Sequence, residues 1–213
     1  MKQIGFGLLL LIIALWSNGC DRQDSANPSP CNGICEDFRA ERDGYGLPKG
    51  YKPVAIVRET QSAHLGAASL AMLINSVTGS TFSEQEVNQG LWEHGNNEKV
   101  KERKSYSLLD MKKYLAAIGY DSAGYKADII SLKELDRPAI VPIQWEGGKY
   151  DPVLEGMDED YVYLADPCLG YRRFTVSEFE EAWSSVCFFI EGKTAAEPSE
   201  GKEKTGDTPL HKK

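Results

Sequence analysis

Apolar positions in the first half of the chain recur at helical spacing. Leu70, Ile74 and Val77 stand at i, i+4 and i+7 in an apolar segment that begins at Leu65 and is followed by Gly79. This pattern predicts a core helix that ends at a glycine. Small residues at the start of this helix would leave its first N–H groups open to close approach.

Two further helices are predicted by capping boxes, in which a serine is followed three residues later by an acidic residue. They cover about 83–92 and 107–118. The polar residues 96–105 between them predict an exposed loop. A shorter helix is expected over 129–135 and should end before Pro138, because the residue before a proline disfavours helical geometry.

Beyond Pro138 the apolar residues come in short runs that are typical of strands. These runs cover 139–145, 153–157, 161–165 and 186–190. A last helix is expected to reach Trp183, opened by a capping box of Ser177 and Glu180. Helices followed by antiparallel strands predict an α+β fold in which N-terminal helices pack on an antiparallel sheet.

The N-terminus has the pattern of a secretory signal, with a positive start and an apolar run over 4–16. The run is short for a bilayer span, which needs about 20 apolar residues. Small residues before Cys20 resemble a bacterial lipobox, so 1–19 are predicted as a signal peptide and Cys20 as the lipidated residue. The alternatives are an ordinary signal peptide with an unmodified Cys20 and an uncleaved anchor. All three place the domain outside the cytoplasm, in the bacterial cell envelope.

Polar segments flank the predicted domain. Residues 20–50 have the composition of a tether and 193–213 that of a disordered tail, which leaves 51–192 as the folded domain. With 41% hydrophobic and 26% charged residues, the chain is globular in type. Its net charge of −8 argues against a nucleic-acid partner, because affinity for phosphates comes from clustered Lys and Arg.

The chain contains five cysteines and three histidines. Outside the cytoplasm, the cysteines other than Cys20 favour disulfides. Cys31 and Cys35 are close enough in sequence for a local bridge, which would leave Cys168 to pair with Cys187, although four cysteines permit three pairings. No histidine stands at ligand spacing from them, so neither a metal nor another cofactor is expected.

Four segments carry a resemblance to a known family. They are GAASLAML at 66–73, YSLLDMKKYL at 106–115, RPAIVP at 137–142 and VYLADPCLG at 162–170. In this order they resemble the C39 peptidases, which cleave bacteriocin leaders after a double glycine. The resemblance covers about 53–190 and implies a papain-like cysteine peptidase fold, with the nucleophile at a helix N-terminus.

Matched residue by residue, this resemblance places the family's catalytic positions on residues that cannot perform its chemistry. The nucleophilic cysteine corresponds to Leu65 and the general-base histidine to Tyr150, whereas Asp166 retains the aspartate that orients the histidine. Gln61 is the candidate for the oxyanion-hole glutamine. Acyl transfer needs a nucleophile and a base. We therefore expect an inactive site, in which Leu65, Gly66, Tyr150 and Asp166 form a groove for a peptide or an unfolded protein segment.

Neighbouring residues do not restore the missing reagents. Glu59 competes with Gln61 for the oxyanion position, and His64 is expected at the surface of the helix start. Ser62 and Ser69 lack a positioned base. Without a histidine to orient, Asp166 would hydrogen-bond its own turn.

The expected function is that of a lipid-anchored accessory protein, which binds a peptide during export or assembly of a surface or secreted protein such as a fimbria or an amyloid. The alternative is an active cysteine peptidase for double-glycine-type substrates, with Cys168 or Cys187 as its nucleophile. A structural lipoprotein with a filled cleft is a third alternative.

Overall fold

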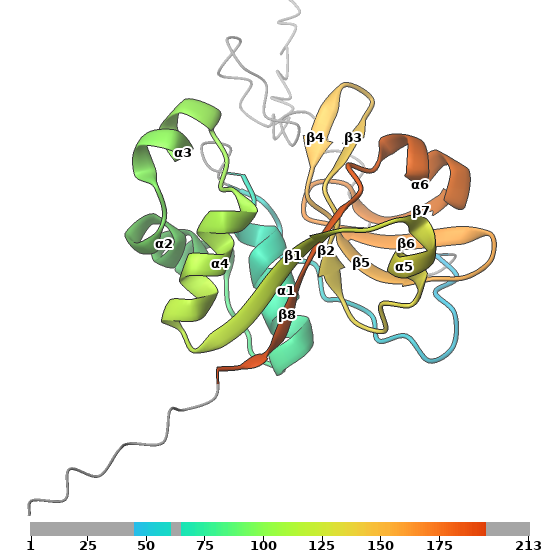
Figure 1. The fold of residues 1–213 in the computed structure, drawn as a ribbon, viewed down its shortest axis with the longest axis horizontal. Helices are drawn as coiled ribbons and strands as arrows, with labels where there is room; N and C mark the ends of the chain where they lie inside the picture. The colour runs from blue at the N-terminus through green and yellow to red at the C-terminus, as the bar shows by residue number, and fades with distance from the viewer. Residues whose placement is uncertain (1–44, 61–64, 195–213) are drawn as a thin grey trace, which may run out of the picture.

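The helices lie mainly in the first half of the chain. The computed structural model describes residues 45–60 and 65–194. In Figure 1, α1 to α4 gather at the left of the sheet, whereas α5 and α6 lie at the right. The helices are α1 (Ala67–Thr78), α2 (Glu84–His94), α3 (Asn97–Arg103), α4 (Leu108–Ala117), α5 (Ile129–Lys133) and α6 (Val176–Ala182).

Two predicted capping boxes are confirmed. In α2 the side chain of Ser83 accepts a hydrogen bond from the N–H of Glu86, whose carboxylate accepts one from the N–H of Ser83. Ser107 and Asp110 form the same reciprocal pair at the start of α4. Both boxes satisfy N–H groups that have no partner within the helix.

Two local predictions are wrong. The last helix begins earlier than expected, because Thr175 and Glu178 form its capping box and Ser177 lies inside it. The polar residues 96–105 are not a loop throughout, since they contain α3. The side chain of Asn96 caps this helix by accepting a backbone N–H, which gives a polar segment a helical start.

Six strands form one antiparallel sheet in the order β1-β8-β2-β5-β6-β7, and β3 pairs with β4 in a separate two-stranded sheet. The strands are β1 (Tyr120–Lys126), β2 (Ala139–Ile140), β3 (Ile143–Trp145), β4 (Gly148–Tyr150), β5 (Val153–Met157), β6 (Tyr161–Asp166), β7 (Gly170–Thr175) and β8 (Val186–Lys193). The single strand expected over 139–145 is divided at Pro142, which has no N–H for a ladder.

Two hydrophobic clusters lie on opposite faces of the larger sheet. The first contains the buried residues of α1, α2 and α4, together with Ile140 and Val153. The second contains buried residues of α5 and α6, together with Ala139 and Leu154. Neighbouring residues of β2 and β5 thus enter different clusters, as expected from the alternation of side chains along a strand.

The structure overturns the pairing of Cys168 with Cys187. Cys187 is a free, buried thiol in β8, where it lies opposite Tyr125 and packs in the second cluster. Cys168 lies after β6 and is disulfide-bonded. The partner of Cys168 is outside the described residues, as are Cys20, Cys31 and Cys35. Spacing along the chain allowed Cys168 and Cys187 to pair, and the structure shows that they do not.

Within residues 45–60 and 65–194, no helix combines the length and the apolar character needed to cross a membrane. The predicted signal peptide at 1–19 and residues 195–213 of the predicted tail lie outside the described residues.

Candidate functional site

The candidate site begins at the N-terminus of α1. Gly66 precedes the helix in a left-handed conformation with φ of 104°, and a Cβ there would lie 2.8 Å from a methionine methyl of α4. Glycine is therefore required at this position. The N–H of Gly66 donates to the carboxylate of Glu59 at 3.2 Å. Backbone hydrogen bonds also fix Leu65 to the connection between α3 and α4.

Asp166 ends β6 and approaches the site from the sheet. Its Oδ1 accepts the N–H groups of Cys168 and Leu169, each at 2.8 Å, so the carboxylate stabilises the β6–β7 turn. The residue is only 2% exposed, and its Oδ2 has no hydrogen-bond partner in the described part of the chain. A buried acceptor without a donor is costly, which makes this oxygen a place where a ligand's N–H would be favoured.

The structure brings Leu65, Gly66, Tyr150 and Asp166 together around one pocket. Its other lining residues are Glu59, Ser69, Lys149, Asp151, Pro167 and Cys168. The free volume is about 20 Å³, enough for roughly one water molecule. A larger ligand would therefore contact the rim of the pocket while these side chains keep their positions.

Buried carboxyl groups dominate the electrostatics of the pocket. Burial, together with a hydrogen bond with Glu84, raises the pKa of Glu59 to about 9. Burial also raises the pKa values of Asp151 and Asp166 to about 6 each. The pKa of Tyr150 is raised by burial and then by the charge of Asp166. Glu59 is consequently neutral at pH 7, and Asp151 and Asp166 lie near their titration range.

The described residues place no reactive thiol or imidazole at the pocket. The sulfur of Cys168 is held in a disulfide, and burial raises the pKa of the Cys187 thiol within the sheet, which makes Cys187 a poor nucleophile. His94, the one histidine among the described residues, ends α2 and stacks on Tyr114 of α4. Ser69 therefore lacks a histidine base. Within the same residues, no three His, Cys, Asp or Glu side chains are arranged to hold a metal ion.

Sequence analysis did not identify Lys149 and Asp151 as members of the site. An aspartate between β4 and the buried strand β5 is the signal that would have found Asp151, because a charge next to a buried strand needs a partner or solvent. Glu59 was considered only as an oxyanion candidate. Three other candidates lie outside the described residues, namely Gln61, Ser62 and His64.

Comparison with known families gives a match over most of the described chain. The model described as "Peptidase C39 family" matches residues 53–195. A Pseudomonas aeruginosa protein named "Probable functional amyloid protease FapD" is 35% identical over 159 residues, which are 69% of this chain and 70% of that protein. The Pseudomonas fluorescens protein of the same name is 30% identical over 152 residues, 67% of each chain.

Solved structures give the same fold. A double glycine motif protease from an AMS/PCAT transporter, crystallised with its leader peptide, superposes with a TM-score of 0.55 at 21% identity, over 68% of this chain and 96% of that one. The peptidase domain of Streptococcus ComA superposes with a TM-score of 0.53 at 19% identity, over 67% and 100%. These matches confirm the predicted α+β, papain-like architecture.

Proposed function

Because the chain belongs to the Peptidase C39 family, we propose that it is a catalytically inactive member that binds a peptide or an unfolded protein segment at the pocket around Leu65 and Asp166. The bound segment belongs to a surface or secreted protein whose export or assembly the chain assists. The proposal includes a location in the bacterial cell envelope, held there by a lipid on Cys20.

The residues at the family's catalytic positions support inactivity. Leu65 stands where the resemblance places the nucleophilic cysteine, and its hydrocarbon side chain cannot attack a carbonyl. Tyr150 stands where it places the histidine. Because the pKa of Tyr150 is raised above its ordinary value, the phenol stays protonated at neutral pH and does not accept a proton as a general base.

The unpartnered carboxyl oxygens at the pocket are the observation that carries the proposal of peptide binding. Oδ2 of Asp166 and Oε1 of Glu59 are both buried without a hydrogen-bond partner in the described part of the chain. They lie around the apolar side chain of Leu65. A peptide presents backbone N–H donors between apolar side chains, so a segment lying across the rim would cover apolar surface and reach these acceptors through the one water that the pocket can hold.

The names of two relatives support a role in assembly. Both the 35% and the 30% identical Pseudomonas proteins carry a name that refers to functional amyloid and to protease activity. The words "functional amyloid" favour an envelope assembly partner for this chain. The word "protease" favours the alternative function, an active cysteine peptidase, for which Cys168 or Cys187 would have to be the nucleophile.

The proposal is tested with the purified full chain and a dye-labelled peptide that contains a Gly-Gly pair. We expect saturable binding by fluorescence anisotropy and an intact peptide by mass spectrometry. Leu65→Lys should weaken binding by about tenfold, since it places a charge in the apolar part of the pocket. The matched control is Leu109→Lys, at a leucine that is 61% exposed on α4, and should leave binding unchanged.

Two results would overturn this proposal. Cleavage of the peptide that disappears in Cys168→Ala or Cys187→Ala would establish the active peptidase instead. Absence of binding by the wild-type chain would leave only a structural role for the filled pocket. Circular dichroism of Leu65→Lys should match that of the wild type, so that weaker binding is not caused by unfolding.

A further inference from the structure

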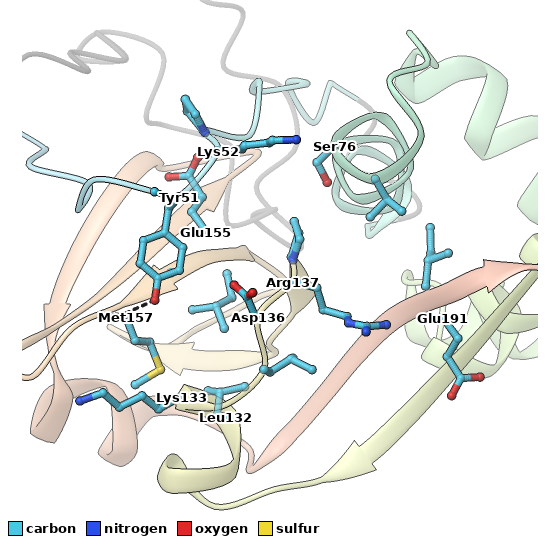
Figure 2. A pocket seen from close by; sticks show the side chains of 18 residues that line it. Tyr51, Lys52, Ser76, Leu132, Lys133, Asp136, Arg137, Glu155, Met157 and Glu191 are labelled. Carbon is cyan, nitrogen blue, oxygen red and sulfur yellow. Dashed lines mark hydrogen bonds between the residues drawn. The ribbon is translucent and has the colours of Figure 1, made fainter.

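A second cavity lies away from the pocket around Leu65. Its volume is about 500 Å³, within the range of ligand sites. The two sites share no lining residue, and they use opposite ends of α1, because Ser69 lines the first whereas Ser76 and Val77 line the second. Figure 2 shows the side chains that surround this cavity, which come from α1, the 50–53 segment, α5, the chain between α5 and β2, β5 and β8.

The cavity lies at the start of β2, a strand of only two residues. β2 pairs with β5 only through Ala139 and Ile140, and with β8 only through Ile140. Pro138, which precedes it, has no N–H to extend the ladder. On the Pro138 side of β2, the described residues offer no strand partner to the β2-side edge of β5 or of β8, although β8 stays paired with β1 along its other edge. Residues 155–157 of β5 and Ile190 and Glu191 of β8 line the cavity instead.

The walls of the cavity combine apolar and charged side chains, and the charged side chains without a described partner are mainly positive. Leu135, Leu154 and Ile190 are among the apolar lining residues. The side chains of Lys52 and Arg137 form neither a hydrogen bond nor an ion pair with a described residue, although the guanidinium of Arg137 lies 5.4 Å from the ring centroid of Phe189. This is unusual in a chain with a net charge of −8.

The acidic residues of the cavity are largely engaged. Glu155 accepts the backbone N–H of Val54, and Glu191 accepts the hydroxyl of Tyr125 at 3.4 Å. Asp136 is the acidic lining residue without such a bond among the described residues. A carboxylate of a ligand could therefore pair with the side chains of Arg137 and Lys52. Hydrogen bonds between two charged groups are among the strongest in proteins.

We propose that this cavity binds an extended peptide segment in which apolar and acidic side chains alternate. Its main chain lies along the β2-side edge of β8 next to the start of β2, in the manner of strand addition, because the carbonyl of Met157 in β5 already accepts the hydroxyl of Tyr51. Its apolar side chains enter the cavity and its carboxylates pair with Arg137 and Lys52. The site is additional to the pocket around Leu65, and the proposal does not depend on the function of that pocket.

The test uses the full chain and a dye-labelled, end-blocked hexapeptide of alternating Val and Glu. We expect binding about tenfold tighter than that of the same peptide with Gln in place of Glu. Arg137→Gln should reduce this preference, and Arg137→Gln combined with Lys52→Gln should remove it. Arg173→Gln is the matched control, because the guanidinium of Arg173 also lies over an aromatic ring, at 4.3 Å from that of Tyr161. It should retain the preference, since Arg173 does not line the cavity.

A second pair of variants tests the location. Val77 lines the cavity and is 42% exposed, so Val77→Trp should fill the space without disturbing the core and abolish binding. Leu109→Trp, at an exposed leucine elsewhere, should have no effect. Leu65→Lys should also leave hexapeptide binding unchanged, which separates this site from the pocket around Leu65.

Three outcomes would overturn the proposal. They are no binding of the acidic hexapeptide, equal binding of the Glu and Gln peptides, and binding that survives Val77→Trp. Oleate that binds the wild-type chain but not Arg137→Gln, while no hexapeptide binds, would assign the cavity to an anionic amphiphile instead.

Discussion

At the scale of single residues, Glu59 links the fold to the chemistry of the candidate site. Its carboxyl accepts the N–H of Gly66 at the start of α1, yet it is buried beside Glu84 and near Asp151. Burial and the neighbouring acids outweigh this hydrogen bond and favour the neutral form. The helix start is therefore held by a group that the fold keeps protonated at neutral pH.

Stability should consequently fall as the pH rises above neutrality. The pKa of Glu59 is about 9 in the folded chain against an ordinary value of 4.5, so the folded state binds more protons than the unfolded state between these limits. The free energy of unfolding should decrease through this window by up to about 1.4 kcal/mol per pH unit for one proton. Urea unfolding between pH 7.5 and 8.5 measures this slope, more than one pH unit above the pKa of about 6 of Asp151 and Asp166.

The variant Glu59→Gln should flatten the slope, because it removes the proton while it keeps the shape of the side chain. Glu159→Gln, at an exposed glutamate in the β5–β6 turn, serves as the control and should retain the wild-type slope. A slope that is the same in the Glu59→Gln and wild-type chains would show that Glu59 is not the group responsible.

At the scale of elements, local signals predicted the parts of the fold that depend on local chemistry. Capping boxes located α2 and α4, because a cap is a short-range hydrogen-bond pattern. The strand β1 was not predicted, since its sequence has no apolar alternation and it becomes a strand by pairing with β8. β7 was also missed, and carries two exposed arginines at the edge of the sheet.

The same distinction applies to the candidate site. Leu65, Tyr150 and Asp166 were expected together from an ordered resemblance, and the structure places them around one pocket. Asp151 was missed and the Cys168–Cys187 bridge was wrong, because both depend on which strands become neighbours. Spacing along the chain does not contain that information.

The segment before α1 is an element without regular secondary structure that packs on β5. The ring of Tyr51 lies over Gly156, where a Cβ would approach its atoms to 2.5–2.7 Å, and its hydroxyl donates to the carbonyl of Met157 at 2.9 Å. The carbonyl of Val54 accepts the hydroxyl of Tyr171 at 2.8 Å. The segment is thus fixed to the sheet by contacts far apart in sequence.

Gly156→Ala should displace Tyr51 and lower the free energy of unfolding by about 1–3 kcal/mol, the usual cost of overpacking. Gly124→Ala in β1 is the matched control, because a Cβ there would meet its nearest atom at 3.6 Å, an ordinary contact. Its effect should stay within about 0.5 kcal/mol. Urea unfolding midpoints compare the two variants, and equal losses would contradict the close packing of Tyr51 on Gly156.

At the scale of the whole molecule, one sheet serves two hydrophobic clusters. The cluster with α1 packs on one face and the cluster with α5 and α6 on the other, and both draw residues from β2, β5, β6 and β8. The candidate pocket has walls from α1 and from the ends of β4 and β6. The geometry of the pocket therefore depends on both clusters remaining packed on the same strands.

This arrangement predicts that the described domain unfolds as a single unit. Leu73→Ala in the first cluster and Leu164→Ala in the second remove fully buried side chains, and each should cost about 3–5 kcal/mol. Because the sheet is shared, each variant should lower the protection of backbone amides in α1 and in β6 together, as measured by hydrogen exchange. Leu109→Ala, at an exposed site, should change the protection of neither element.

Loss of protection in β6 alone after Leu164→Ala would contradict this prediction. It would mean that the two hydrophobic clusters unfold separately, and that the pocket opens whenever the cluster with α5 and α6 unfolds.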